Sequence, residues 1–424
     1  MFWSLFFGFL VYSIIDIYGY RGMRKLFSHG NLTSFRSFFL RTYWVVDVAF
    51  LLFAVGWVLH IRNSGLEDYV QYRKFFYIIG AFILILVPKF SFFLFTAFYD
   101  LKMLVLRISR WAFASHAGTS SVIARWRGSL IVPAVGFVFA GIMFALTLHG
   151  VGFGRYNFQL ELQEMWFEDL PPAFDGYRLL QFSDTHLGSY SQTDDVKSGL
   201  DFIQMMDADL IVFTGDMVNN EAREAEKFLP MFQLLQAEDG MLSILGNHDM
   251  GDYRSWGTIE DKAPDIGKLV ELQKEMGFRV LLNEHVFVKR GNDSIMVAGV
   301  ENWGLPPFAQ NGDLMAALGE HQSFPFKILL SHDPSHWREQ VIPQTDIQLT
   351  LSGHTHGMQV GVTSRFFSWS PVKLKYNEWS GLYGEGDQYL YVNRGFGFLS
   401  FPGRIGMPPE ITLIVLRRGV RPAV

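Results

Sequence analysis

The sequence predicts a chain of two parts: an all-α region of four membrane-spanning helices over residues 1–150, and an α/β domain over residues 156–424. Composition changes near residue 150, from sequence rich in Phe, Leu, Ile, Val and Trp to mixed, charged sequence. In the second part, strand patterns first alternate with helix patterns and then follow one another directly. This order is typical of two sheets packed face to face with helices outside, and about 270 residues suffice for one such core.

Four apolar stretches define the first part, at about residues 1–20, 43–60, 75–98 and 129–149. Each is close to the length of about 20 residues that a helix needs to cross a bilayer. The alternatives are buried core helices or, for the first stretch, a cleavable signal peptide. A signal peptide is disfavoured because Met1 and Phe2 lead directly into apolar sequence without a basic region. A transporter is also disfavoured because the region has no internal repeat, so we expect an anchor.

Loop charges predict the orientation of this anchor. Residues 21–42 and 99–128 are both basic and are therefore expected on the cytoplasmic side. The amino terminus and the α/β domain are then expected on the extracytoplasmic side of a cell (inner) membrane, which the chain crosses several times. The basic residues are Arg21, Arg24, Lys25, Arg36 and Arg41 in the first loop, and Lys102, Arg107, Arg110, Arg125 and Arg127 in the second.

Three ionisable residues fall within the predicted spans: Asp16, Asp47 and Lys89. A charge inside a membrane is costly unless it is paired or reaches the interface. We therefore expect Lys89 to pair with Asp16 or Asp47. The alternative is that each side chain extends separately to the cytoplasmic interface.

The α/β domain begins with an alternating segment at residues 158–163, which is typical of a half-buried strand. Apolar, β-prone runs follow at residues 178–183, 210–214, 241–245, 327–331 and 347–352, and further strands are predicted at 286–288, 295–298, 389–392 and 411–415. Helical patterns lie at residues 194–206, 221–236 and 265–276, and Gly277 ends the last of them.

Polar residues follow five of these predicted strands. Open α/β sheets bind ligands at the carboxyl ends of their strands, so these residues are expected to converge. Their oxygen and imidazole donors suit Mn, Fe, Zn or Co, and a chain without cysteine offers no thiolate. Each motif alone could be an ordinary turn or helix cap, but all five in order indicate a two-metal site. The motifs are Asp184-Thr185-His186, Gly215-Asp216, Gly246-Asn247-His248-Asp249, His332 and Gly353-His354-Thr355-His356.

This ordered set resembles the calcineurin-like metallophosphoesterase family over about residues 156–416. Within that family the chain is most similar to bacterial membrane-anchored or envelope-associated phosphoesterases. The resemblance implies a four-layer α/β/β/α fold. The segments that carry the finer likeness are Leu170-Pro171-Pro172, Asp175-Gly176-Tyr177-Arg178, Ser183 to Gly188, Gly353 to Gln359 and Asn393 to Gly397.

The resemblance also implies a role for each site residue. Asp216 would bridge two divalent ions that share a hydroxide, and this hydroxide would attack a phosphomonoester, phosphodiester or pyrophosphate. His248 would lie outside the metal ligands and protonate the leaving group. The first metal would be held by Asp184, His186 and His356, and the second by Asn247, His332 and His354.

Three further residues are candidates for supporting roles. Family members often carry Asp where this chain has Asn219, so Asn219 is expected to orient His248 less strongly, or Asp249 to do so instead. Arg394 is a candidate for gripping phosphate, with a strand-end salt bridge as the alternative. Residues 365–376 mix aromatic and cationic side chains, which fits either ordinary packing or an interfacial lip that admits a lipid-linked phosphate.

Two functions from different classes remain open. The first is a membrane-anchored phosphoesterase with a lipid-linked or cell-envelope substrate. The second is a scaffold or binding protein that keeps the fold without turnover. The complete set of ligands favours the enzyme. The net charge is only −5 and the domain has no basic stripe, so no nucleic-acid partner is expected.

Overall fold

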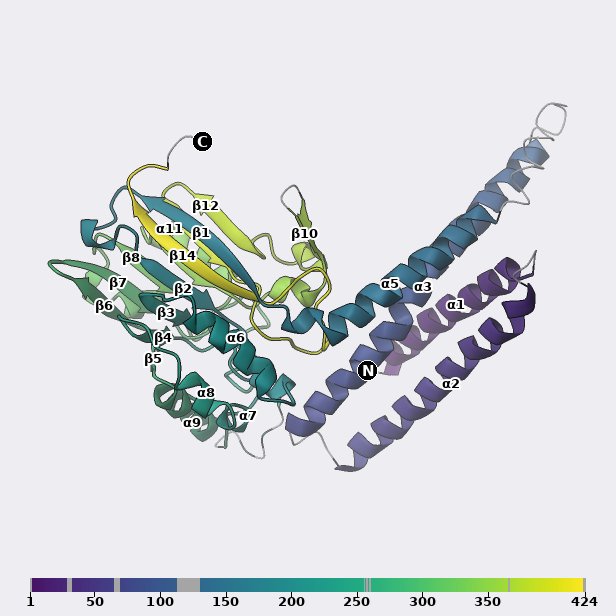
Figure 1. Ribbon diagram of the computed structural model, residues 1–424, viewed down its shortest axis with the longest axis horizontal. Helices are drawn as coiled ribbons and strands as arrows, with labels where there is room; N and C mark the ends of the chain where they lie inside the picture. The colour runs from purple at the N-terminus through teal and green to yellow at the C-terminus, as the bar shows by residue number, and fades with distance from the viewer. Residues whose placement is uncertain are drawn as a thin grey trace. The chain divides into compact units, whose positions relative to one another are not determined.

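The computed structural model describes residues 2–28, 33–64, 69–112, 130–254, 256, 258, 261–364 and 367–421 (Figure 1). The chain divides into two compact units. One contains Met1–Gly65 and Ile78–His149, and the other contains Leu66–Tyr77 and Gly150–Val424. The short segment Leu66–Tyr77 was not expected in the second unit. The predicted loop residues Arg125 and Arg127, and residues 365–366, lie outside the described residues.

The first unit is helical, and a helix lies over most of each of the four predicted spans. Among the described residues, three segments are long and apolar enough to cross a membrane: Arg36–Trp57, Tyr69–Ser109 and Ile131–Tyr156. The first helix is not one of these three, although it lies over most of the predicted span 1–20. The helices are α1 (Phe2–Leu26), α2 (Thr33–Ser64), α3 (Tyr69–Ala112) and α5 (Ile131–Gly152).

These helices are longer than the apolar stretches that predicted them. α3 has 44 residues, although the apolar stretch within it covers only 75–98. The reason is that hydropathy marks the part of a helix that suits hydrocarbon, whereas the backbone hydrogen bonds continue into polar sequence. The predicted loop 21–42 is likewise mostly helical, at the end of α1 and the start of α2.

Lys89 pairs with both carboxylates inside the helical unit. Its Nζ lies 2.7 Å from Asp16 Oδ1 and also contacts Asp47 Oδ2. Tyr43 donates a hydrogen bond of 2.9 Å to Asp16 Oδ1, and Tyr12 donates one of 3.0 Å to Asp47 Oδ1. The cluster therefore joins α1, α2 and α3, and pairing rather than separate extension to the interface satisfies the three charges.

Replacing Lys89 with Leu would leave two buried carboxylates without their cation. Breaking a buried ion pair by removing one partner costs about 3–5 kcal/mol, so we expect a loss of that size in unfolding free energy in detergent or lipid. Adding Asp16→Asn and Asp47→Asn to Lys89→Leu should recover most of it, because neutral amides are less costly to bury. Unchanged stability of the single variant would show that the cluster is not required.

The second unit contains two six-stranded sheets. In the first sheet, β2, β3, β4 and β5 run parallel, while β14 runs antiparallel to β2 and pairs in parallel with β1. Its strands, in spatial order, are β1 (Gln159–Phe167), β14 (Glu410–Arg418), β2 (Arg178–Phe182), β3 (Leu210–Phe213), β4 (Met241–Ser243) and β5 (Phe278–Val280).

The second sheet has a parallel centre and antiparallel edges. β13, β9, β8 and β7 are parallel, and β12 and β6 close the two sides. A separate two-stranded hairpin joins β10 (Val362–Thr363) to β11 (Ser368–Trp369). The strands of the second sheet, in spatial order, are β12 (Gly381–Glu385), β13 (Gln388–Val392), β9 (Leu349–Ser352), β8 (Lys327–Leu330), β7 (Asp293–Gly299) and β6 (Glu284–Arg290).

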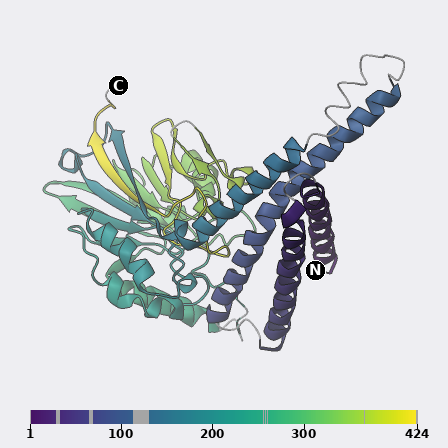
Figure 2. The ribbon, with the colours of Figure 1, turned by 45° about the vertical axis from the view of Figure 1, so that its right-hand side comes forward.

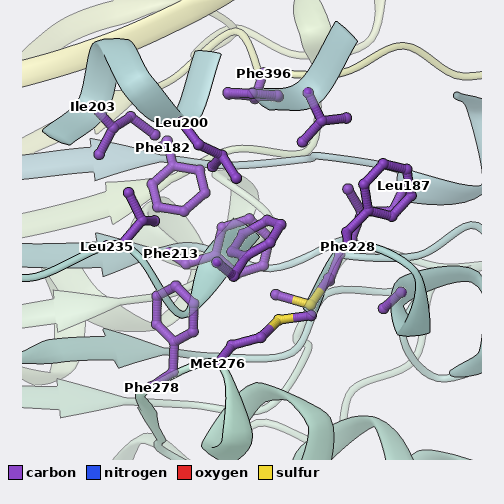
Figure 3. Close-up of a cluster of buried hydrophobic side chains, with 14 of the residues drawn as sticks. Phe182, Leu187, Leu200, Ile203, Phe213, Phe228, Leu235, Met276, Phe278 and Phe396 are labelled. Atoms are coloured by element: carbon purple, nitrogen blue, oxygen red, sulfur yellow. The ribbon is translucent and has the colours of Figure 1, made fainter. Parts of the chain in front are cut away.

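The sheets pack face to face, and helices cover their outer faces. Between the sheets, buried side chains such as Leu179 and Val212 meet Ile328 and Leu351. On the outer face of the first sheet, Phe182, Phe213 and Phe278 pack beneath the helices, as Figure 3 shows. Figures 1 and 2 show these helices together on one side of that sheet: α6 (Asp194–Gln204), α7 (Arg223–Glu226), α8 (Leu229–Phe232) and α9 (Lys262–Glu275).

The outer face of the second sheet has its own cluster. Leu314 and Leu318 of α10 (Leu314–Leu318) pack there with Trp337, close to α11 (Ile342–Gln344). The predicted four-layer α/β/β/α fold is therefore confirmed.

One predicted helix was wrong in extent. Residues 221–236 form two short helices, α7 and α8, instead of one long helix. Pro230 lies in the first turn of α8, where a missing N–H costs nothing, whereas the interior of a continuous helix would lose a hydrogen bond there. The strands β5, β10, β11 and β12 were not predicted, because they are short and lack a clear alternation.

Candidate metal centre

The five motifs meet at one end of the two sheets. The loops that carry them leave the carboxyl ends of neighbouring strands, three in the first sheet and two in the second. Asp184 and His186 follow β2, Asp216 follows β3, Asn247 and His248 follow β4, His332 follows β8, and His354 and His356 follow β9.

Asp184, His186 and His356 form one group of possible metal ligands, with one donor atom from each lying within 4.8 Å of the others. All three side chains are buried. His186 Nε2 lies 3.1 Å from His356 Nε2, and His356 Nε2 lies 3.2 Å from Asp184 Oδ1. Two ring nitrogens and a carboxylate oxygen that face one point fit a shared cation.

Asp216, His332 and His354 form the second group. His332 Nε2 lies 3.1 Å from Asp216 Oδ2 and is buried without a hydrogen-bond partner among the described residues. Asn247 Oδ1 lies 2.7 Å from His354 Nδ1. Asp216 Oδ2 is also 3.7 Å from His186 Nε2 of the first group, so this carboxylate lies between the two groups.

Most of the candidate donors at this end of the sheets have a strained backbone conformation. Five of the donors have positive φ angles: Asp184 at 54°, His186 at 46°, Asp216 at 59°, His354 at 70° and His356 at 51°. Such a conformation is uncommon for residues other than glycine, and it clusters at functional sites. The left-handed conformation turns the side chains of successive loops towards common points.

At two glycines of the motifs, the backbone lies so close to a carboxylate that no side chain would fit. A Cβ on Gly246 would meet Asp216 Oδ1, and a Cβ on Gly353 would meet Asp184 Oδ2. Glycine at these positions therefore lets the loops after β4 and β9 pass directly beside the two carboxylates.

Electrostatics favour cation binding at both carboxylates. Burial alone would raise the pKa of Asp184, but His356 and His332 beside it hold that pKa below its usual value. The pKa of Asp216 is also lowered, because His332 and His248 outweigh its burial. Both groups therefore stay ionised and provide buried negative charge.

A second layer of residues, which the sequence analysis missed, orients the histidines. Thr214 O lies 2.7 Å from His332 Nδ1, and Arg404 Nη2 lies 3.1 Å from His356 Nδ1. Tyr376 donates a hydrogen bond of 3.3 Å to Asp333 Oδ2, and its oxygen lies 2.9 Å from His354 Nε2. His354 Nε2 then carries the proton, and Nδ1 is free to face the site together with Asn247 Oδ1.

Removing the Tyr376 hydroxyl should therefore weaken metal binding. Partners of this kind typically contribute about 10–100-fold to metal affinity, and we expect a loss in that range for Tyr376→Phe in metal titrations of the apo protein. Tyr177→Phe is a matched control, because it removes a hydroxyl that donates to Asp239 Oδ2 at 2.8 Å, remote from the motifs. Equal affinities for both variants would contradict the orienting role.

His248 lies beside the two groups without belonging to either. Its backbone N–H donates to Asp216 Oδ1 at 2.8 Å, and its Nδ1 lies 2.8 Å from Asn219 O. The ring stacks on Tyr253, with centroids 4.3 Å apart, and lies edge-on to His186. The side chain is half-buried, and burial lowers its pKa. Since Nδ1 faces a carbonyl, Nε2 is the nitrogen left for a proton transfer.

The predicted roles of Asn219 and Asp249 need correction. The Asn219 side chain contacts Ser189 Oγ at 3.3 Å, and only its backbone carbonyl meets His248. Asp249 accepts backbone N–H groups from Asp216, Met217, Val218 and Gly246, and so ties the loops after β3 and β4 together. The difference between Asn and Asp at position 219 therefore has no direct effect on His248, because a backbone carbonyl is the same for every residue.

The contacts of Arg394 differ from the predicted contact with substrate. Its guanidinium pairs with Glu410 and Glu161, and the residue is only 3% exposed. This is the alternative salt bridge. Arg394 follows β13 of the second sheet, and the two carboxylates lie on β14 and β1 of the first sheet.

Comparison with known proteins identifies the same two parts. Residues 177–358 match the family described as calcineurin-like phosphoesterase, and residues 1–155 match a probable calcineurin-like phosphoesterase transmembrane domain. These matches confirm the predicted resemblance, and the second of them indicates a transmembrane region in the first part of the chain. The family uses divalent metals, in agreement with the two ligand groups.

Several relatives are similar over most of their length. The uncharacterized metallophosphoesterase YkuE of Bacillus subtilis is 33% identical over 280 residues, which are 63% of this chain and 90% of the relative. A transmembrane protein with metallophosphoesterase domain of Danio rerio is 27% identical over 350 residues, covering 80% and 72%. An uncharacterized metallophosphoesterase of Campylobacter jejuni is 24% identical over 413 residues, covering 96% of each chain. The chain therefore belongs to the calcineurin-like phosphoesterase family.

Proposed function

We propose that this protein hydrolyses a phosphoester or pyrophosphate bond with two divalent metal ions, Mn, Fe, Zn or Co, on a lipid-linked or cell-envelope substrate. The observation that carries the proposal is the position of Asp216. Its Oδ2 lies 3.1 Å from His332 Nε2 in one ligand group and 3.7 Å from His186 Nε2 in the other. One carboxylate can therefore serve both groups.

The residues divide the chemistry between them. When bound, a pair of divalent ions activates water and neutralises charge on the phosphoryl oxygens. Asp184, His186 and His356 would hold the first ion, and Asn247, His332 and His354 the second, with Asp216 shared. The left-handed backbone at five of these seven donors fixes them before substrate arrives, so little reorganisation is needed during reaction.

His248 would supply the proton that the leaving oxygen needs. His248 is outside both ligand groups, and its backbone N–H donates a hydrogen bond to Asp216. The carbonyl oxygen of Asn219 holds Nδ1 of the ring. Its Nε2 is therefore the donor in this proposal. The stacked Tyr253 ring fixes the plane of the imidazole.

The membrane helices support the choice of substrate. A metal centre on a chain that is anchored in a bilayer meets phosphates of that bilayer and its envelope more often than dilute soluble metabolites. We further propose that the amino terminus and the metal centre face the extracytoplasmic side, on the basis of the basic segments 21–42 and 99–128. Single cysteines can test this orientation by labelling from each side, because the chain has no native cysteine.

The direct test is metal-dependent hydrolysis by the purified full chain. Protein stripped of metal should cleave a nitrophenyl phosphodiester only after Mn, Fe, Zn or Co is restored, and two equivalents should be needed for full activity. A panel of lipid phosphates, lipid pyrophosphates and soluble phosphoesters then identifies the substrate class. Metal binding without turnover of any of these compounds would favour the binding or scaffold protein instead.

A further inference from the structure

A hairpin next to the metal centre exposes apolar side chains. We call the described residues 357–364 and 367–376 the lip. The lip starts directly after His356 and ends at Tyr376, whose oxygen lies 2.9 Å from His354 Nε2. Both ends of the lip are therefore fixed at the metal centre. It contains the paired strands β10 and β11.

The lip is built on a small core of its own. Val372, Tyr376 and Trp379 pack against Met407 in a buried cluster. Ser370 Oγ donates a hydrogen bond of 2.7 Å to Gly357 O across the hairpin. Other apolar side chains of the lip lie outside this cluster and are exposed.

The exposed side chains of the lip combine large apolar groups with cations. Leu374 is 88% exposed and lies between Lys373 and Lys375, which are also exposed. An exposed apolar patch on a folded domain indicates an interaction site, and flanking lysines indicate an anionic partner. The other exposed large apolar residues of the lip are Met358, Val362, Phe367 and Trp369.

Hydrogen bonds connect the lip to the end of a membrane helix. Arg404 N donates to Gly150 O, near the end of α5, at 3.1 Å. The next residue, Ile405, accepts from Gly361 N of the lip at 2.9 Å and donates to Gln359 O at 2.8 Å. Gly150 belongs to the segment Ile131–Tyr156, which is long and apolar enough to cross a membrane. Two consecutive residues, Arg404 and Ile405, thus link the lip to Gly150 within this apolar segment.

We propose that the lip docks on the anionic surface of the membrane that holds the helices. Leu374 and Trp369 would enter the headgroup zone, where aromatic and aliphatic groups are stable, while Lys373 and Lys375 would contact lipid phosphates. A lipid whose headgroup is drawn along the lip arrives beside His354 and His356. This selection of a lipid substrate rests on the proposed hydrolase function, whereas the docking itself does not.

Site-specific fluorescence on the full chain tests the docking. The variants Leu374→Cys and Val420→Cys would each be labelled with an environment-sensitive fluorophore and reconstituted in phosphatidylglycerol-containing vesicles. Val420 is a matched control because it is 71% exposed. It follows β14, which runs antiparallel to β2, so it lies at the end of the first sheet away from the metal centre.

The proposal expects nitroxide-labelled lipids to quench the Leu374 probe several-fold more than the Val420 probe. Equal quenching of both probes would overturn it. A Leu374 probe that is shielded from water yet not quenched by lipid would also overturn it, since that result indicates a second copy or another protein on the lip.

A kinetic measurement separates this proposal from the proposed function. The variant Leu374→Asp with Lys373→Gln and Lys375→Gln should lose about tenfold in kcat/KM on a phosphate ester of a vesicle lipid, because its attraction to the surface is lost. Its activity on soluble nitrophenyl phosphate should be unchanged. Equal losses on both substrates would count against docking. If neither substrate is cleaved even by the native chain, the hydrolase proposal fails while the quenching result still decides the docking.

Discussion

Replacing Asp216 with Ala is expected to abolish phosphoesterase activity and metal binding together. The carboxylate lies between both ligand groups, so its loss removes a donor from each of the two sites. Metal ions contribute several kcal/mol to stabilising the transition state, which corresponds to a loss of at least about 10³-fold in kcat/KM. Metal content of the purified variant should fall in parallel with its activity.

A stability measurement distinguishes this effect from misfolding. Ligand at about 100 times its Kd stabilises a protein by about 2.7 kcal/mol, so added metal should raise the Tm of the native chain and leave that of Asp216→Ala unchanged. Asp387→Ala is a control, since Asp387 is exposed in the turn between β12 and β13. Full activity or metal content in Asp216→Ala would refute the shared carboxylate.

Replacing His248 with Ala should slow hydrolysis in a way that depends on the leaving group. An alkoxide needs a proton as it departs, and a positioned acid contributes about 10²–10⁴-fold. A nitrophenolate needs little protonation, so its ester should lose far less activity. The ratio of kcat/KM between an alkyl ester and a nitrophenyl ester of the same phosphate should therefore fall by about 10²-fold or more, while metal content stays native.

The control for His248→Ala is a histidine at the other end of the second sheet. His321 precedes β8, whereas His332 follows it, so His321→Ala should leave both esters unaffected. Equal losses of kcat/KM on both esters in His248→Ala would contradict the proton-donor role. Loss of metal from this variant would instead make His248 a ligand.

Most of the fold followed from patterns that act over short stretches of chain. The burial of β2, β3, β8 and β9 on both faces requires continuous apolar runs, and these runs are visible directly in the sequence. The helix predicted at 221–236 was wrong because the periodicity of apolar residues continues through Pro230, whereas a continuous helix would lose a backbone hydrogen bond there. The short strand β10 has a contact that sequence patterns do not show, because Thr363 Oγ1 lies 3.4 Å from Sδ of Met407, which is distant in sequence.

The candidate metal centre follows from the sequence for a different reason. Its donors sit directly after strands of the predicted sheets, so topology alone gathers them at one end. Its supporting residues follow no such rule. Tyr376 and Arg404 reach His354 and His356 through loops, and the contact of His248 with Asn219 uses a backbone atom that has no sequence signature.

The sequence by itself determined the two-part organisation and the family, and it singled out the seven candidate donors, because hydropathy, strand periodicity and motif spacing are properties of local sequence. Only the tertiary structure decided which groups meet across the chain. It placed Lys89 between Asp16 and Asp47, and it paired Arg394 with glutamates. Such contacts depend on the relative position of elements that are tens to hundreds of residues apart, and the packing of the whole unit fixes that position.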